Sequence, residues 1–283
     1  MALILIPTPL GNLRDITLRA LDVLAACDSI VAEDTRVAAR LLAAYGIRGK
    51  RVSGYREQNA LDVTRAILDR AREHTVAVLS DAGMPGISDP GRELVAAARA
   101  AGVAVEVLPG ASAFVCAAVL SGFPLERFSF DGFLPRARGE RERALRAALL
   151  RATTTVWYEA PHRILASLTA LDALAPEAEV FVGRELTKLH EQQVLGTPSA
   201  AAAALEAPVR GEIVLVLAPY ARVEKAVTEE QLEAAIDAAL AAGSPPAAIA
   251  KALAGESAHS RQELYARVIE RKLARERSSE DSF

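Results

Sequence analysis

The sequence predicts an α/β protein in which two α/β domains precede a small helical module at the carboxyl end. Three observations predict this fold class. Five apolar runs alternate with helix-like segments over residues 2–122, five more apolar runs occupy residues 128–219, and only helix-like patterns follow. Alternating strands and helices indicate a mainly parallel sheet covered on both faces. A cleft is expected between the first two domains. The three predicted domains are residues 1–115, 116–220 and 228–283.

The first series repeats the order strand, loop, helix. The predicted strands are residues 2–7, 29–34, 50–55, 75–80 and 103–110. The helix-like segments that follow them are residues 16–26, 35–46, 59–74, 92–101 and 112–122. Gly46 and Gly102 stand where helix C-caps are expected, because glycine adopts the left-handed conformation without strain.

The second series is expected to contain less helix between its strands. The predicted strands are residues 128–133, 153–160, 178–186, 191–196 and 211–219. The two runs that flank Lys188 are close in sequence, so we expect them to pair antiparallel. This half would then have a mixed sheet.

The carboxyl-terminal module is expected to contain three short helices. Thr228 with Gln231, and Ser260 with Glu263, have the spacing of capping boxes, and Gly243 would end the first helix. Arginine and lysine alternate with glutamate along the last helix. This pattern is typical of a solvated helix face, and nucleic-acid contact is the alternative.

Composition restricts the class of protein. The 283 residues are 51% hydrophobic and 24% charged, which excludes a disordered chain and allows two domains of ordinary size. The net charge of -3 argues against a protein devoted wholly to nucleic acid, but it averages over local basic patches that could bind a phosphate backbone. Cys27 and Cys116 lie far apart and are interpreted as core thiols. No signal peptide or membrane-spanning run is evident, so we expect a cytoplasmic protein.

Three loops in the first half follow predicted strands and contain residues suited to binding. They are residues 8–15, 79–91 and 109–113. Because parallel strands end at one edge of a sheet, these loops can converge on one small molecule. The first loop has a single glycine, so dinucleotide binding has poor support.

Charged segments in the second half allow two interpretations. The segment YEAPHR (residues 158–163) is either the polar start of a helix or part of a site, and GRELTKLHE (residues 183–191) is either a charged hairpin tip or a site. The arginine-rich residues 135–151 form either a solvated face or a surface that binds RNA phosphates, and proximity to the cleft favours RNA. No two histidines have metal-ligand spacing, so no metal site is expected.

Six motifs in order resemble those of one known family. The motifs are TPLGNLRDIT, AEDTR, SDAGMPGISDPG, PGASA, YEAPHR and GRELTKLHE. They are similar to motifs of the ribosomal RNA small subunit methyltransferase I family, which has the tetrapyrrole methylase-like (class III) fold. The resemblance covers residues 3–219, and the helical tail also matches. It implies that S-adenosylmethionine binds between the two α/β domains, usually in a homodimer.

The resemblance also implies a substrate and site residues. The implied reaction is 2′-O-methylation of a decoding-region cytidine, cytidine 1402, in 16S rRNA of the small ribosomal subunit. The implied cofactor contacts are Leu10, Gly11, Asp81, Gly83, Met84, Ile87, Ser112, Ala113, Tyr158, Gly183 and Gly211. The candidate general bases are Lys188, Glu33, Asp34 and Glu191. The candidate RNA-binding residues are Arg36, Arg136, Arg138, Arg141, Arg143, Arg163 and Arg184.

Positioning is expected to contribute more to such a transfer than a general base does. Positioning can supply about 7–11 kcal/mol, whereas a base adds roughly a hundredfold to ten-thousandfold. Three alternatives stay open at this point. They are a methyltransferase of the same fold that acts on a tetrapyrrole or a protein residue, a non-catalytic RNA-binding assembly factor, and a nicotinamide oxidoreductase, which the missing glycine fingerprint disfavours.

Overall fold

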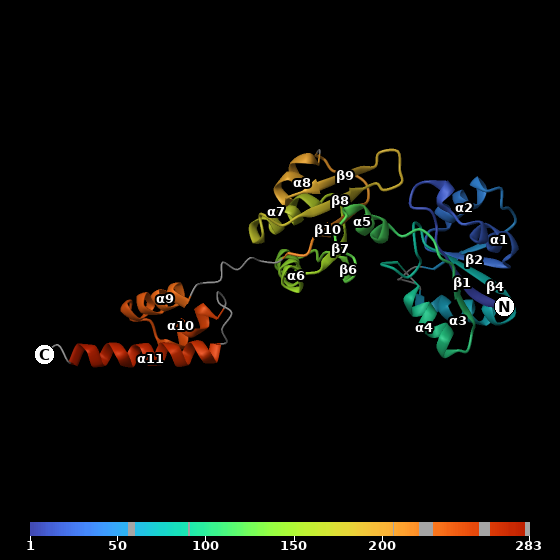
Figure 1. Cartoon of the computed structure of the whole chain (residues 1–283). Helices are drawn as coiled ribbons and strands as arrows, with labels where there is room; N and C mark the ends of the chain where they lie inside the picture. Colours follow the sequence, from blue (N-terminus) through green and yellow to red (C-terminus); the bar gives the residue numbers. More distant parts are fainter. Residues whose placement is uncertain (56–59, 90, 206, 221–228, 255–260, 281–283) are drawn as a thin grey trace. The chain divides into compact units, whose positions relative to one another are not determined.

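The computed structural model describes residues 1–55, 60–89, 91–205, 207–220, 229–254 and 261–280 (Figure 1). The chain divides into two compact units, Met1–Tyr220 and Ala221–Phe283. The first unit contains two five-stranded sheets with their helices, and the described part of the second unit is helical. The predicted fold class is confirmed. None of the described helices combines the length and the apolar character needed to cross a membrane.

The first sheet is parallel throughout and has the strand order β3-β2-β4-β1-β5. Its strands are β1 (Ala2–Ile6), β2 (Ser29–Ala32), β3 (Arg51–Gly54), β4 (Thr75–Leu79) and β5 (Val105–Val107). All five lie within the apolar runs seen in the sequence. β1 and β4 pair in register until Ile6 meets Leu79. The loops that follow these two strands therefore leave from one edge of the sheet.

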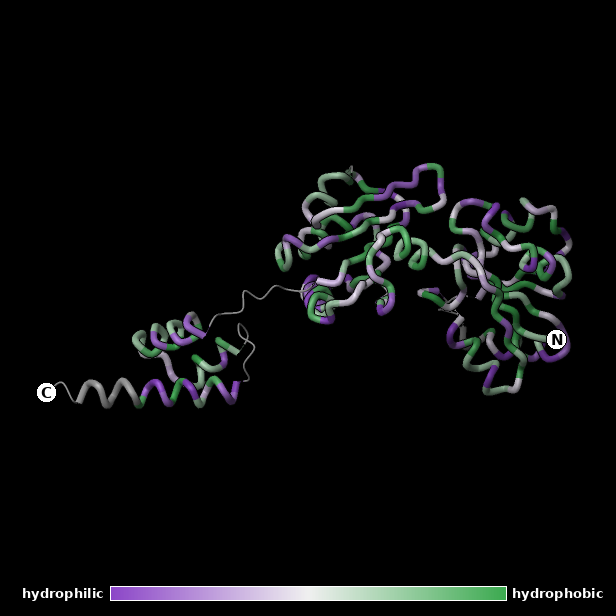
Figure 2. The backbone as a smooth tube through the Cα atoms, viewed as in Figure 1, coloured by the Kyte–Doolittle hydropathy of each residue, from purple (hydrophilic) through white to green (hydrophobic). Residues whose placement is uncertain are grey.

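Helices cover both faces of the first sheet. They are α1 (Leu18–Ala26), α2 (Thr35–Ala44), α3 (Ala60–Glu73) and α4 (Arg92–Ala100). Successive residues of a strand point to opposite faces. Ile4 and Ile6 accordingly pack in the core under α1 and α2, while Leu3 and Leu5 pack under α3 and α4. Figure 2 shows the central strands of this sheet, β1 and β4, as apolar segments.

The helix ends follow the sequence signals. Thr17 caps α1 by accepting a hydrogen bond from the Ala20 amide, and Asp34 caps α2 in the same way. Gly46 and Gly102 have φ angles of 70° and 68°, which confirms the predicted C-cap conformations.

The second sheet is mixed and has the strand order β6-β7-β10-β8-β9. Its strands are β6 (Phe128–Phe133), β7 (Thr154–Glu159), β8 (Val180–Arg184), β9 (Gln192–Gly196) and β10 (Ile213–Leu217). β6 and β7 are parallel, and the other neighbours are antiparallel. The predicted antiparallel pairing on either side of Lys188 is confirmed by β8 and β9.

Helices also cover both faces of the second sheet. On one face lie α6 (Arg138–Arg151), α7 (Ile164–Leu174) and α8 (Pro198–Ala204), and on the other lies α5 (Ala113–Ser121). Trp157 is buried in the core beneath α6 and α7. Ala117 and Ala118 of α5 pack on Val156 and Val214 of the sheet. Because α5 starts directly after the loop that follows β5, it connects the edge of the first sheet to the second.

The second unit forms its own core. Its helices are α9 (Glu229–Ala241), α10 (Pro246–Leu253) and α11 (Arg261–Glu280). Leu232, Ile249 and Leu264, one from each helix, are buried together. Gly243 has a φ of 74° just after α9, as predicted. Thr228, Ser260 and the side chain of Gln231, which carry the predicted capping boxes, lie outside the described residues.

Candidate functional site

A pocket of about 400 Å³ lies where the loops of the first sheet meet the second sheet. The first half contributes Leu10 after β1, Glu33 after β2, and residues 81–84 and 87–89 after β4. The remaining lining residues are Ser112, Ala113, Phe133, Tyr158, Glu159, Ala160, Pro161, Leu186, Gly211, Glu212, Ile213 and Val214. The three loops that the sequence predicted to converge therefore meet at one cavity.

The loop after β4 is joined to the loop after β1. Thr8 and Gly83 exchange two backbone hydrogen bonds of 3.0 Å, and the Thr8 hydroxyl donates to the Ser80 carbonyl oxygen. Gly83 has a φ of 79°, and a Cβ at this position would lie 3.2 Å from Leu10 Cδ2. Glycine is therefore required here both by the left-handed backbone and by the close approach of Leu10.

Five acidic residues line the pocket, namely Glu33, Asp81, Asp89, Glu159 and Glu212. Glu159 pairs with Arg163, and Glu212 pairs with Lys188. Burial, together with the negative charges of Glu33, Asp81 and Glu212, raises the pKa of Asp89 to about 7. Asp81 Oδ1 accepts a 3.0 Å hydrogen bond from the Asp34 amide. Among the described residues, no three His, Cys, Asp or Glu side chains form a group that could hold a metal ion. The acidic lining attracts a cationic ligand and repels anions.

The second half adds aromatic surface and one unsatisfied hydroxyl to the pocket. The Tyr158 ring meets Phe133 edge-on at 5.4 Å between centroids, and burial raises the pKa of Tyr158 to about 12, so the phenol stays neutral. Ser112 is the N-cap of α5 but makes no side-chain capping bond. Its Oγ is buried without a hydrogen-bond partner among the described residues. Because an unpaired buried hydroxyl is costly, a polar ligand group would stabilise this site.

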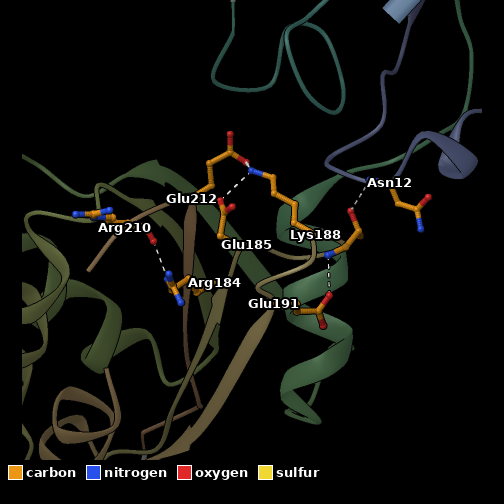
Figure 3. Close-up of polar contacts among 8 residues, drawn as sticks. Asn12, Arg184, Glu185, Lys188, Glu191, Arg210 and Glu212 are labelled. Carbon is orange, nitrogen blue, oxygen red and sulfur yellow. Dashed lines mark hydrogen bonds and ion pairs between the residues drawn. The ribbon is translucent and has the colours of Figure 1, made fainter. Parts of the chain in front are cut away.

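An ionic network at the β8–β9 hairpin tip supports the wall of the pocket (Figure 3). Lys188 Nζ donates to Glu185 Oε1 at 2.9 Å and to Glu212 Oε2 at 3.0 Å. The Glu212 amide donates to Glu185 Oε1 at 2.8 Å. Partial burial acts to lower the pKa of Lys188, but the hydrogen bonds to both carboxylates raise it overall. The Lys188 ammonium therefore stays charged.

The same hairpin tip contacts the loop after β1. A Cβ added at Gly11 would lie 2.1 Å from Lys188 Cγ, so the lysine side chain lies directly on the glycine. The Asn12 amide donates to Thr187 Oγ1 at 3.3 Å (Figure 3). The two halves of the first unit are therefore joined beside the pocket by backbone and side-chain contacts.

A second hollow, of about 590 Å³, lies beside the hairpin. We call it the basic hollow. Its lining residues are Arg184, Leu189, His190, Glu191, Gln192, Ala207, Pro208 and Arg210. Arg184 Nε donates to the Arg210 carbonyl oxygen at 2.7 Å, and Arg184 Nη1 donates to Gln192 Oε1 at 3.3 Å. These bonds fix the Arg184 side chain at the hollow.

Nine of the eleven residues predicted to contact the cofactor line the pocket. They are Leu10, Asp81, Gly83, Met84, Ile87, Ser112, Ala113, Tyr158 and Gly211. Gly11 and Gly183 do not line it. Gly11 lies against Lys188, and a Cβ at Gly183 would lie 3.2 Å from both Leu186 and Phe181. The cofactor contacts themselves stay predictions.

The candidate bases have different surroundings. Glu33 lines the pocket. Asp34 caps α2 and pairs with Arg36. Lys188 is a charged donor in the ionic network, and Glu191 lies at the basic hollow. A general base must reach the proton that it removes, and of the four candidates only Glu33 lines the pocket. The identity of the base stays a prediction.

The predicted RNA-binding arginines separate by exposure. Arg36, Arg136, Arg138 and Arg143 are exposed. Arg141 is only 8% exposed, because it lies on the face of α6 that buries Leu145. Arg163 forms an ion pair with the buried Glu159 and donates to the Leu134 carbonyl oxygen. Arg141 is therefore mostly buried and the Arg163 guanidinium is already bonded within the fold, so the exposed arginines are better placed for RNA. Contact of these arginines with RNA stays a prediction.

The sequence reasoning missed several residues that line the pocket. Asp89 belongs to the glycine-rich loop that the sequence singled out, and Glu212 directly follows the predicted contact Gly211. Phe133 ends the apolar run of residues 128–133, and Leu186 lies in the charged segment of residues 183–191. The position of Asp89 in that loop was an available signal. For Glu212, the only signal in the sequence was its position beside Gly211, at the start of a predicted apolar strand.

Comparisons with known proteins give a consistent result. Residues 2–202 match the family model for Tetrapyrrole (Corrin/Porphyrin) Methylases. The chain is 39% identical over 267 residues to Ribosomal RNA small subunit methyltransferase I of Synechocystis sp., covering 93% of this chain and 95% of that protein. It is 40% identical over 277 residues to the protein of the same name from Mesorhizobium japonicum, covering 96% and 92%. A crystal structure of diphthine synthase shares the fold, with a TM-score of 0.63, 16% identity and coverage of 76% and 89%.

Proposed function

Because the chain belongs to the ribosomal RNA small subunit methyltransferase I family of tetrapyrrole methylases, we propose that it methylates the ribose 2′-hydroxyl of a decoding-region cytidine in 16S rRNA. S-adenosylmethionine is the methyl donor. The small ribosomal subunit or its 16S rRNA is the proposed partner, and the cytoplasm is the proposed compartment.

The acidic pocket is the observation that carries this proposal, and its residues fit the donor. Asp81, Asp89 and Glu212 face a cavity of about 400 Å³, and S-adenosylmethionine has a cationic sulfonium and an ammonium group. Opposite charges at short range in a partly buried site attract strongly. The unpaired Ser112 Oγ offers a hydrogen bond to a polar group, and Tyr158 offers an aromatic surface to an apolar one.

The protein's own residues would act mainly by binding and orientation. When bound, the donor supplies an electrophilic methyl group, which the substrate oxygen accepts as the hydroxyl proton leaves. The bridge between Thr8 and Gly83 and the network at Lys188 hold two walls of the pocket in fixed positions. Such fixed positioning can supply about 7–11 kcal/mol of the barrier reduction. Glu33 and Asp89 line the pocket, where either carboxylate could hold the released proton.

Mass mapping of 2′-O-methylated nucleotides tests the proposed function. We expect 16S rRNA from cells that lack the gene to lose one ribose methyl group on a decoding-region cytidine, and the purified protein with S-adenosylmethionine to restore it. Unchanged methylation after gene removal would refute the proposal. A protein that binds 16S rRNA but not S-adenosylmethionine in calorimetry would instead be a non-catalytic assembly factor.

We further propose a homodimer, supported by the apolar outer surface of α5. Val115, Val119 and Leu120 are 45%, 64% and 43% exposed, although α5 already packs on the sheet through its other side. Exposed apolar patches of this kind mark interaction sites. Light scattering of the wild-type chain and of Val119→Glu should show a dimer and a monomer respectively. Equal masses for both would argue against this surface.

A further inference from the structure

We infer that the basic hollow is a subsite for a phosphodiester group of the substrate RNA, placed next to the methyl-donor pocket. This inference rests on the proposed function and adds a specific contact to it. A phosphate contact fixes the position of an RNA strand without reading its sequence. The hollow would therefore hold the backbone near the nucleotide that is modified.

The hollow and the donor pocket share one wall. Arg210 lines the hollow, and Glu212, two residues later, lines the pocket. Arg184 and Leu186 repeat this arrangement on the neighbouring segment. Two residues of extended chain span only about 7 Å, so each arginine lies within that backbone distance of a residue that lines the pocket.

The basic side chains at the hollow are available to a ligand. Within the part of the chain that the structure describes, neither the Arg210 guanidinium nor the His190 ring has a hydrogen-bond or ion-pair partner, and both residues are exposed. Arg184 uses Nε and Nη1 within the protein, which leaves Nη2 unused. By contrast, Arg36 pairs with Asp34 and Arg138 pairs with Glu142.

The carboxylate at the hollow is bonded within the hairpin. Glu191 Oε2 accepts from the Thr187 amide at 2.7 Å, and Oε1 accepts from Gln193 Nε2 at 2.6 Å. Arg184 and Arg210 therefore leave the hollow with a net positive charge. An arginine guanidinium binds phosphate oxygens through parallel hydrogen bonds, and an imidazole N–H can add another.

The charge of the neighbouring pocket explains why such a subsite is needed. The carboxylates of Glu33, Asp81, Asp89 and Glu212 attract a cationic donor, but they repel the phosphates of a polyanion. RNA must nevertheless bring a ribose to the edge of that pocket. Cationic side chains on the other side of the same wall offset this repulsion locally.

The test uses the full-length chain with Arg210→Gln and His190→Gln combined. Both side chains are exposed and unpartnered among the described residues, so the fold should be retained. Arg99→Gln is the matched control, because Arg99 is an exposed residue in the last turn of α4. This helix leads to the amino end of β5, at the edge of the parallel sheet opposite to the loops that line the pocket. The probes are purified, unmodified small ribosomal subunits and S-adenosylmethionine.

We expect the double variant to raise the KM for subunits roughly tenfold, because the loss of one hydrogen bond to a charged group weakens binding by about this factor. The slope of log(kcat/KM) against log[salt] should become shallower by about one, because the Arg210 guanidinium no longer neutralises a phosphate. The kcat at saturating subunit and the affinity for S-adenosylmethionine should match those of the wild type, and Arg99→Gln should change neither KM nor slope.

An active wild type with the same KM and salt slope in the double variant would overturn the inference and leave the proposed function intact. A double variant that loses affinity for S-adenosylmethionine in parallel would also overturn it, because the hollow would then act through the donor pocket. A wild type that transfers no methyl group either to subunits or to 16S rRNA would refute the proposed function itself.

Discussion

Asp89 shows how the properties of a single residue depend on the folded chain. Its carboxyl group would be charged at neutral pH in an unfolded chain, but in the pocket its pKa is raised to about 7 by burial and by Glu33, Asp81 and Glu212. The folded state therefore binds a proton that the unfolded state has already released. By linkage, the Asp89 contribution makes the fold less stable as pH rises from about 4 to about 7.

Donor binding should depend on pH through Asp89. A cationic ligand favours the carboxylate, so we expect the affinity for S-adenosylmethionine to rise roughly tenfold between pH 6 and pH 8, with proton release near neutrality. Asp89→Asn should abolish this dependence and should bind like the protonated wild type. Calorimetry in two buffers of different ionisation enthalpy measures both quantities. The same pH dependence in wild type and Asp89→Asn would assign the proton to another group.

The sequence could not predict this residue chemistry. Asp81 and Asp89 share one loop, but Glu33 and Glu212 are distant from it in the chain, and only the folding of two sheets brings all four to one cavity. The burial of Arg141 was also hidden, because it lies among charged residues in the first half of α6, whereas the apolar residues of the inner face, Leu145 and Ala148, come later in the helix. The sequence motifs located the loops, but they did not show which side chains influence one another.

At the scale of secondary structure, the sequence was far more informative. All ten strands of the described residues lie within the predicted apolar runs, and their lengths range from three to six residues. The buried strands β1, β2, β4, β7, β8 and β10 leave the clearest continuous apolar segments. The hairpin between β8 and β9 was also predicted from its two closely spaced runs. What the pattern could not show is that this tip contacts Gly11 and Asn12, since docking between elements is decided by tertiary packing.

The hairpin tip should depend on the charge of Lys188 for positioning, not for proton transfer. Lys188→Met leaves Glu185 and Glu212 side by side without their cation, so we expect the free energy of unfolding to fall by about 1–2 kcal/mol. Single-turnover methyl transfer should also slow, and the factor by which it slows should be the same at every pH. Lys188→Arg should recover most of both losses, because it keeps the charge.

The pH–rate profile distinguishes this role from general-base catalysis. If Lys188 only positions the hairpin tip, the plot of rate against pH keeps its shape in Lys188→Met. If Lys188 were the base, the variant would lose the limb of the profile in which the rate rises as the base loses its proton. Loss of that limb, or a Lys188→Arg variant as slow as Lys188→Met, would contradict the positioning role. Thermal unfolding of the three proteins provides the stability comparison.

At the scale of the whole molecule, the two units have separate cores. The helical unit buries Leu232, Ile249 and Leu264 among its own helices, and Arg271 of α11 pairs with Glu233 and Asp237 of α9. The charges of α11 are thus partly neutralised within the unit. The pocket that we propose for the donor is, in contrast, lined entirely by residues up to Val214.

A chain that ends at Tyr220 should therefore fold and bind the donor. We expect its affinity for S-adenosylmethionine to stay within about twofold of the full-length value, because a unit with its own core can fold alone. Any loss should appear in the KM for small ribosomal subunits, which would assign the helical unit to substrate binding. Calorimetry and steady-state kinetics on both chains measure the two effects, with circular dichroism as the control for folding. A shortened chain that is folded but no longer binds S-adenosylmethionine would show that the helical unit supports the pocket, contrary to the separate cores of the two units.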